Sequence, residues 1–84
     1  MAQCFPNPVR SRAVLQFALP KASAVTLAVY DIQGRRTNTL LSGATLEPGT
    51  HSVPLQVDGW KPGIYFYRIE ADGRTAVRKL LVAP

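Results

Sequence analysis

Apolar and polar side chains alternate in several short stretches of this chain. In "RAVLQFALP" (12–20), the odd-numbered positions hold Ala, Leu, Phe and Leu, and the even-numbered positions between them hold Val, Gln and Ala. In "SAVTLAVYD" (23–31), Val25, Leu27 and Val29 share one face. A period of two is that of a β-strand, and β-branched and aromatic residues favour strand over helix. The two stretches therefore predict two consecutive strands.

Turn signals separate these strands from others about every ten residues. Gly34 is expected in the left-handed conformation, and Pro48-Gly49 and Asp72-Gly73 predict tight turns. We expect further strands at 37–43 (short and weak), at 51–55, at 64–70 and at 75–82. Since Pro54 has no N–H, the strand at 51–55 should be an edge strand or contain a bulge. No helical period longer than one turn occurs, so we predict an all-β fold, an immunoglobulin-like antiparallel β-sandwich of six to seven strands.

The N-terminal segment contains two prolines two residues apart, Pro6 and Pro8. Proline fixes its own φ and forces the preceding residue into an extended conformation, so Phe5 and Asn7 should both be extended. We therefore expect this segment to lie along a sheet edge.

The C-terminal stretch "GIYFYRIEADGRTAVRKLLVAP" (63–84) predicts a β-hairpin whose second strand runs almost to the last residue. A two-residue turn would pair Tyr67 with Arg78, whereas a three-residue loop would pair Tyr67 with Val77, and the sequence leaves both registers open. Arg78 and Lys79 point to opposite faces in either case. An exposed edge on this strand could pair with a partner strand, with the two cations adding electrostatic complementarity.

Length and charge limit the classes of function. The 84 residues suffice for one domain (1–84) with one core. The net charge is +5, but no run of cations exceeds two residues, so surface charge is favoured over nucleic-acid binding. No stretch approaches the roughly 20 apolar residues of a membrane span, and no signal peptide is visible. We interpret the chain as a domain excised from a longer protein.

Residues that could carry chemistry are few. The single cysteine, Cys4, lies near the chain end, and the single histidine, His51, lies within a predicted strand, so a cysteine–histidine catalytic pair is disfavoured. The carboxylates are scattered, and Asp31, Asp58 and Asp72 sit near glycines as they do in ordinary turns. We therefore predict no enzyme activity, no metal site and no cofactor. Trp60, in a loop beside a lysine, is the one candidate for stacking on a carbohydrate ligand.

Five motifs occur together in order: "FPNP" (5–8), "VTLAVYDIQGRR" (25–36), "GTHSVPL" (49–55), "KPGIYFYRIEADG" (61–73) and "RKLLV" (78–82). Together they resemble the C-terminal sorting domains of the type IX secretion system, and they are similar to the immunoglobulin-like domain of flagellar hook-capping proteins. The residues that match the sorting-domain motifs are Pro6, Asn7, Pro8, Tyr30, Asp31, Gly34, Gly63, Tyr65, Arg78, Lys79, Leu80 and Val82. The chain departs from the pattern at its end, Ala83-Pro84, where family members often end in a basic or apolar residue.

The resemblance implies a β-sandwich at the C-terminus of an exported cargo. The cargo would fold in the periplasm, and the outer-membrane secretion machinery would then recognise the domain. A sortase-like cysteine protease removes such domains in many cases and joins the cargo to the cell surface. Two alternatives stay open: an accessory module that binds carbohydrate or the cell surface, and a structural immunoglobulin-like spacer.

Overall fold

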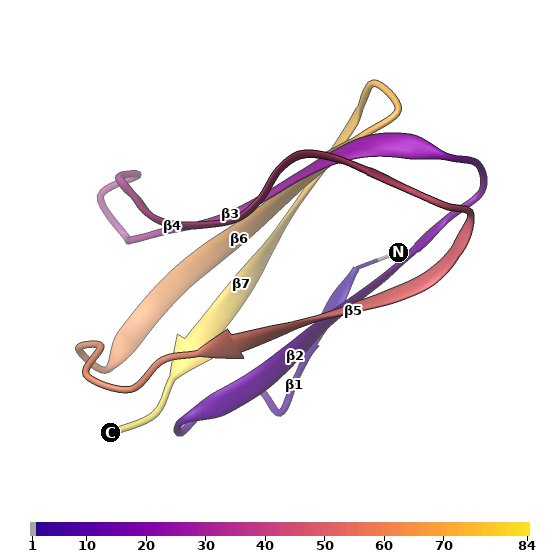
Figure 1. Cartoon of the computed structure of the whole chain (residues 1–84). Helices are drawn as coiled ribbons and strands as arrows, with labels where there is room; N and C mark the ends of the chain where they lie inside the picture. Colours follow the sequence, from indigo (N-terminus) through magenta and orange to yellow (C-terminus); the bar gives the residue numbers. More distant parts are fainter. Residues whose placement is uncertain (1) are drawn as a thin grey trace.

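The computed structural model describes residues 2–84, which form seven strands in two antiparallel sheets (Figure 1). The strands are β1 (Gln3–Phe5), β2 (Arg12–Leu19), β3 (Ser23–Tyr30), β4 (Arg36–Leu46), β5 (Gly49–Gln56), β6 (Gly63–Ala71) and β7 (Arg74–Val82). One sheet has the order β1-β2-β5 and the other β4-β3-β6-β7. The two sheets face each other as a sandwich, which confirms the all-β, immunoglobulin-like prediction.

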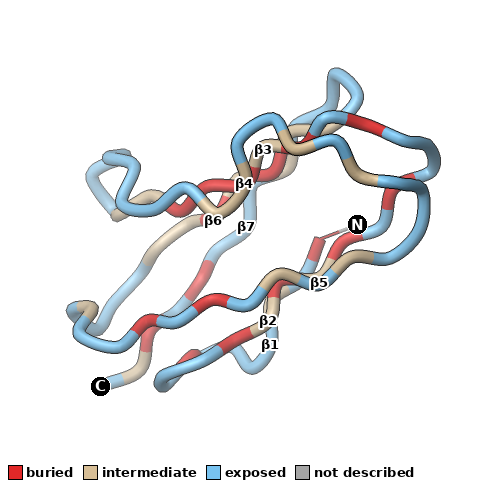
Figure 2. Tube along the Cα trace, viewed as in Figure 1, coloured by how far each residue is buried: buried red, intermediate tan, exposed pale blue. Residues whose placement is uncertain are grey.

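The core lies between the two sheets, and the alternation of side chains builds it. Buried positions lie along the strands of both sheets, whereas the turns are mostly exposed (Figure 2). Leu15 of β2, Leu27 of β3, Leu55 of β5 and Leu80 of β7 are all fully buried. Each such leucine stabilises the fold by about 1.5–3 kcal/mol relative to an exposed side chain. Both sheets, including the last strand, therefore contribute to one core.

Strand positions agree with the sequence pattern except at β4. This strand has 11 residues, more than the short strand expected at 37–43. Its pairing with β3 is irregular, with register shifts on both sides of Leu27 and at Tyr30. β4 is a mostly polar edge strand that pairs with β3 through its backbone. It can therefore extend across these shifts without a strict alternation of apolar side chains. β5 is an edge strand, as Pro54 predicted.

The N-terminal segment belongs to both sheets. β1 pairs with β2 at the edge of the three-stranded sheet. The chain then passes two cis peptide bonds, Phe5–Pro6 and Asn7–Pro8, and Val9 forms a parallel bridge with Val82 in the other sheet. The expectation that this segment lies along an edge is confirmed. The segment closes one side of the sandwich beside the C-terminal strand (Figure 1).

Candidate functional site: the terminal hairpin and its N-terminal latch

The β6–β7 hairpin has a two-residue turn. Asp72 and Gly73 both have positive φ values, 52° and 71°, as a type I′ turn requires. Tyr67 consequently pairs with Arg78, and Tyr65 with Leu80. The structure selects the first of the two registers that the sequence left open.

The two faces of β7 have different roles. Leu80 and Val82 point into the core and are buried. Arg78 shares their face by alternation, yet it is exposed, on a strand that forms the edge of its sheet. Lys79 lies on the opposite, outer face and is exposed as well. Both cations of the last strand therefore reach solvent.

Asn7 binds the outer edge of β7 through its side-chain amide. Its Oδ1 accepts a hydrogen bond from the backbone N–H of Leu81 at 3.0 Å, and its Nδ2 donates to the backbone oxygen of Lys79 at 3.3 Å. A carboxamide has the donor and acceptor geometry of a peptide group, so Asn7 takes the place of a neighbouring strand. The Asn7 amide thus forms the two hydrogen bonds that a neighbouring strand would form with Lys79 and Leu81.

Val9 continues this pairing in the main chain. Its N–H donates to the oxygen of Leu81 at 2.7 Å, and its oxygen accepts from the N–H of Ala83 at 2.7 Å. Val9 is also fully buried. We call Asn7, Pro8 and Val9 the N-terminal latch. The expectation of an exposed terminal edge is therefore wrong from the Lys79 oxygen to the Ala83 N–H, because the latch already occupies these outward backbone groups.

The sequence predicted an edge segment but not which edge it would cover. The signal was present: an asparagine between two prolines has an amide that can pair where the neighbouring proline offers no N–H. The partner strand is 72 residues away along the chain. Only the fold brings the two together.

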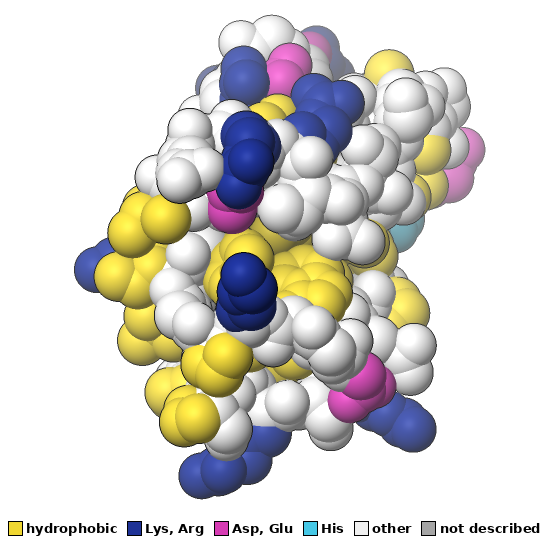
Figure 3. Space-filling model, turned by 90° about the vertical axis from the view of Figure 1, so that its left-hand side faces the viewer, with side chains coloured by type: hydrophobic (Ala, Val, Ile, Leu, Met, Phe, Trp, Pro, Cys, Tyr) yellow, Lys and Arg dark blue, Asp and Glu magenta, His cyan; other side chains and the backbone are white. Residues whose placement is uncertain are grey.

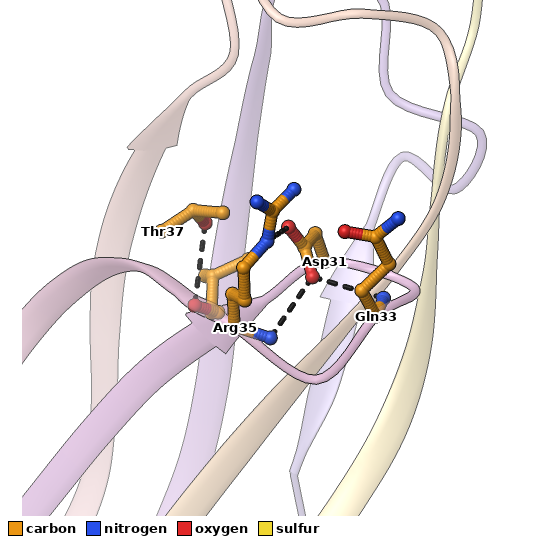
Figure 4. Close-up of polar contacts among 5 residues, drawn as sticks. Asp31, Gln33, Arg35 and Thr37 are labelled. Carbon is orange, nitrogen blue, oxygen red and sulfur yellow. Dashed lines mark hydrogen bonds and ion pairs between the residues drawn. The ribbon is translucent and has the colours of Figure 1, made fainter.

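Tyr30, Asp31 and Gly34 form the turn between β3 and β4 (Figure 4). Asp31 Oδ1 accepts hydrogen bonds from the N–H groups of Gln33 and Arg35, both at 2.9 Å, and its Oδ2 pairs with the Arg35 guanidinium at 2.9 Å. The hydrogen bond from the Arg35 backbone is the main reason that the pKa of Asp31 lies below its ordinary value. Gly34 has φ 83°, as predicted. This carboxylate fixes the conformation of the turn.

Tyr30 connects this turn to the outer face of the four-stranded sheet. Its hydroxyl accepts a hydrogen bond from Arg36 at 3.1 Å, which holds the pKa of the phenol below its ordinary value. Tyr30 pairs with Phe66, and Phe66 pairs with Lys79. Two residues of the matched motifs, far apart in sequence, thus lie in one cross-strand row.

Gly63, Tyr65 and Trp60 lie at the start of β6. Gly63 has φ 144° and pairs with Val82. The Tyr65 hydroxyl donates to the oxygen of Lys61 at 2.8 Å, and the Trp60 and Tyr65 rings lie 5.0 Å apart. Trp60 is half-buried against the core and does not project as a free ring. At this end of the molecule, hydrophobic side chains form much of the central surface, and basic side chains lie above it, below it and in its middle (Figure 3).

Cys4 and His51 flank β2 on opposite sides. Cys4 lies on β1, where it pairs with Leu15 of β2, and burial raises the pKa of its thiol to about 11. The His51 ring stacks on Phe17 at 5.6 Å, and its Nε2 lies 2.7 Å from the oxygen of Glu47. Within residues 2–84 there is no group of His, Cys, Asp and Glu side chains that could hold a metal ion. The same residues contain no helix that is long and apolar enough to cross a membrane.

The comparisons with known proteins agree with the motifs. A sequence model of the family described as secretion system C-terminal sorting domain matches residues 3–83. A search of curated proteins finds no match. The match extends from β1 through the last strand and so covers the latch, both sheets and the terminal hairpin. The chain belongs to the family of C-terminal sorting domains, and its function is that of a sorting signal for type IX secretion.

Proposed function

We propose that the folded domain, rather than a linear peptide, is the signal, and that it reports to the secretion machinery that a cargo has been made to its end. The observation that carries this proposal is the latch. Residues at the start of the domain hold residues 79–83, and Leu80 and Val82 of the same strand complete the core. A sandwich lacking its last strand would expose apolar surface in both sheets.

The matched motif residues divide into two groups by their contacts. Most of them have contacts that build the fold, in the latch, the turn, the sheet or the core: Asn7, Tyr30, Asp31, Gly34, Tyr65, Leu80 and Val82. Pro6, Pro8 and Gly63 are exposed and flank these residues in the chain. Arg78 and Lys79 are exposed and form no ion pair with any residue from 2 to 84. We propose that these two cations contact the outer-membrane machinery directly.

The remaining steps follow the family role. The domain would be joined to an N-terminal cargo that passes through the periplasm and reaches the cell surface or the medium. A sortase-like cysteine protease would release the cargo from the domain and attach it to the surface. The domain itself would act as a substrate and not as an enzyme. In support of this, Cys4 is held as a neutral thiol on the far side of β2 from His51.

Export of a reporter tests the proposal. Residues 1–84 are fused behind a periplasmic reporter in a host with a type IX system, and the reporter is measured in the periplasm, on the surface and in the medium. Export of the full-length fusion and retention of a fusion lacking residues 79–84 are expected. Arg78→Ala with Lys79→Ala should retain the reporter although the purified domain stays folded. The matched control, Arg12→Ala with Lys61→Ala, should be exported. Equal export of both double variants would contradict the role of the two cations.

A further inference from the structure

The latch closes only half of the terminal strand's edge. In β7 the backbone groups of residues 79, 81 and 83 point away from β6, toward the latch. Pairing with β6 is regular from Arg74 to Val82, so the outward direction alternates along the whole strand. Thr75 and Val77 therefore also point their N–H and C=O groups outward. No latch residue bonds to them, and within residues 2–84 these outward groups have no backbone hydrogen-bond partner, so they can pair with a partner strand.

An apolar groove of about 340 Å³ adjoins this open half. It lies between the two sheets, where β1 stays with β2 and leaves the side of β7 uncovered. Its lining includes Phe17 and Leu19 from β2, Ile69 from β6 and Ala76 from β7. A strand added to the edge of β7 would point alternate side chains into this groove.

The outer face of the same hairpin carries three exposed apolar side chains, one at the open half and two at the latched end. Val77 is 51% exposed, Leu81 36% and Ile64 38%, and Ile64 pairs with Leu81 across the strands. Val77 lies at the open half of the edge. The side chains of an added strand that do not enter the groove would thus meet Val77, with Arg68 opposite it on β6 and Lys79 next to it on the same face of β7.

The charges around the open edge that have no ion-pair partner within residues 2–84 are all positive. Arg74 and Arg78 lie on either side of Ala76 on the groove face, and Lys79 is on the outer face. None of the three forms an ion pair with an acid in the described part of the chain. The two nearest acids are engaged, Asp72 with Lys21 at 3.3 Å and Glu70 with Arg68 at 3.1 Å. The edge therefore favours an acidic partner and disfavours a second copy of this chain, whose net charge is +5.

We propose that the open half of β7, from Thr75 to Lys79, is an acceptor site for an extended, acidic segment of another protein, which pairs with the strand edge and places alternate apolar side chains in the groove. This inference rests on the proposed function for its biological setting, where the partner is a component of the secretion machinery. Charged residues on an edge strand also serve simply to prevent unwanted pairing, and the test separates the two roles.

A defined peptide tests the site. The probe is a capped eight-residue peptide with glutamates opposite Arg74, Arg78 and Lys79 and with leucine and valine opposite Ala76 and Val77. Its binding to the 84-residue domain is measured by fluorescence anisotropy and by amide chemical shifts. We expect saturable binding that weakens as ionic strength rises, with the largest shifts at the amides of the open edge. A peptide with the same side chains but N-methylated at alternate residues should not bind, because it cannot pair along its main chain.

Two variants of the domain locate the contact. Val77→Pro removes an outward N–H that the ladder to β6 does not use, so the fold should persist while binding is lost. Arg74→Glu with Arg78→Glu should weaken binding about tenfold or more, since each exposed pair changes from attraction to repulsion. Arg12→Glu with Lys61→Glu changes the net charge equally, far from the edge, and should bind as the unmodified domain does. Both test variants are checked for an unchanged amide spectrum away from β7.

The outcomes are distinct. Absence of binding, or binding unaffected by Val77→Pro or by N-methylation, overturns the proposal. The cations would then serve only to prevent unwanted pairing at the edge. A dimer of the domain in sedimentation that Val77→Pro abolishes would show that the occupant is a second copy, which also overturns it. Because the peptide assay contains no secretion machinery, its failure leaves the export result untouched. Loss of export by a domain that still binds the peptide would count against the proposed function alone.

Discussion

Replacing Asn7 with alanine should open the C-terminal half of the last strand without unfolding the domain. The substitution removes the hydrogen bonds to the Leu81 N–H and the Lys79 oxygen, at 3.0 and 3.3 Å. It leaves in place the two main-chain bonds that Val9 makes to Leu81 and Ala83. The perturbation is therefore confined to the outward backbone groups of Lys79 and Leu81 that Asn7 contacts.

The size of the effect follows from the exposure of these groups. A hydrogen bond contributes about 0.5–1.5 kcal/mol net, and both of these lie at an exposed edge where water can replace the amide. We therefore expect Asn7→Ala to lower the free energy of unfolding by about 1 kcal/mol in total. A domain of this size has about 4–13 kcal/mol of stability, so it stays folded, with a melting temperature about 4–8 °C lower.

Hydrogen exchange gives the sharper assay, because it resolves single amides. The Leu81 amide has Asn7 as its partner, whereas the Leu80 amide points inward, toward Tyr65 of β6. In Asn7→Ala the Leu81 amide should exchange about tenfold faster or more, and the Leu80 amide should change only by the loss of global stability. Asn38→Ala is the matched control, because Asn38 is exposed on β4 and makes no side-chain hydrogen bond within residues 2–84. Unchanged protection at Leu81, or an equal stability loss in the control, would refute the latch.

Three further predictions concern the core, the turn and the thiol. Leu80→Ala should destabilise the domain by about 2–5 kcal/mol in urea denaturation, while Leu81→Ala on the outer face should cost about 1 kcal/mol or less; equal losses would contradict the register. The folded-state pKa of Asp31 is lowered, so its contribution to stability is present above the unfolded pKa and is lost as pH falls through the folded one; Asp31→Asn should flatten the acid limb of a stability–pH curve. With a pKa of about 11, Cys4 should react with a disulfide reagent at pH 8 about a hundredfold more slowly than in the urea-unfolded chain, and equal rates would show that the thiol is not buried.

The sequence was a good guide where a local period or a turn decided the structure. The alternation at 12–20 and 23–31 predicted β2 and β3 to within a residue, and the Asp72-Gly73 dipeptide predicted the type I′ turn. It was a poor guide to β4, where a polar edge strand pairs through its backbone and has no apolar period to read. It could not identify the partner of Asn7, because that contact joins residues separated by almost the entire chain. Long-range pairing of this kind depends on the topology and not on any local preference.

The alternation of β7 explains how one strand can complete the fold and also be recognised. Successive side chains of a strand point to opposite faces, so Leu80 and Val82 are fixed by packing while Lys79 stays exposed on the outer face. The same alternation divides the backbone, since one set of amides pairs with β6 and the other points outward. The latch occupies the outward set at residues 79–83 and leaves Thr75 and Val77 open. Under the proposal above, a partner that pairs with Thr75 and Val77 would meet a strand whose other half is already held by the start of the domain, so recognition would depend on a completed fold.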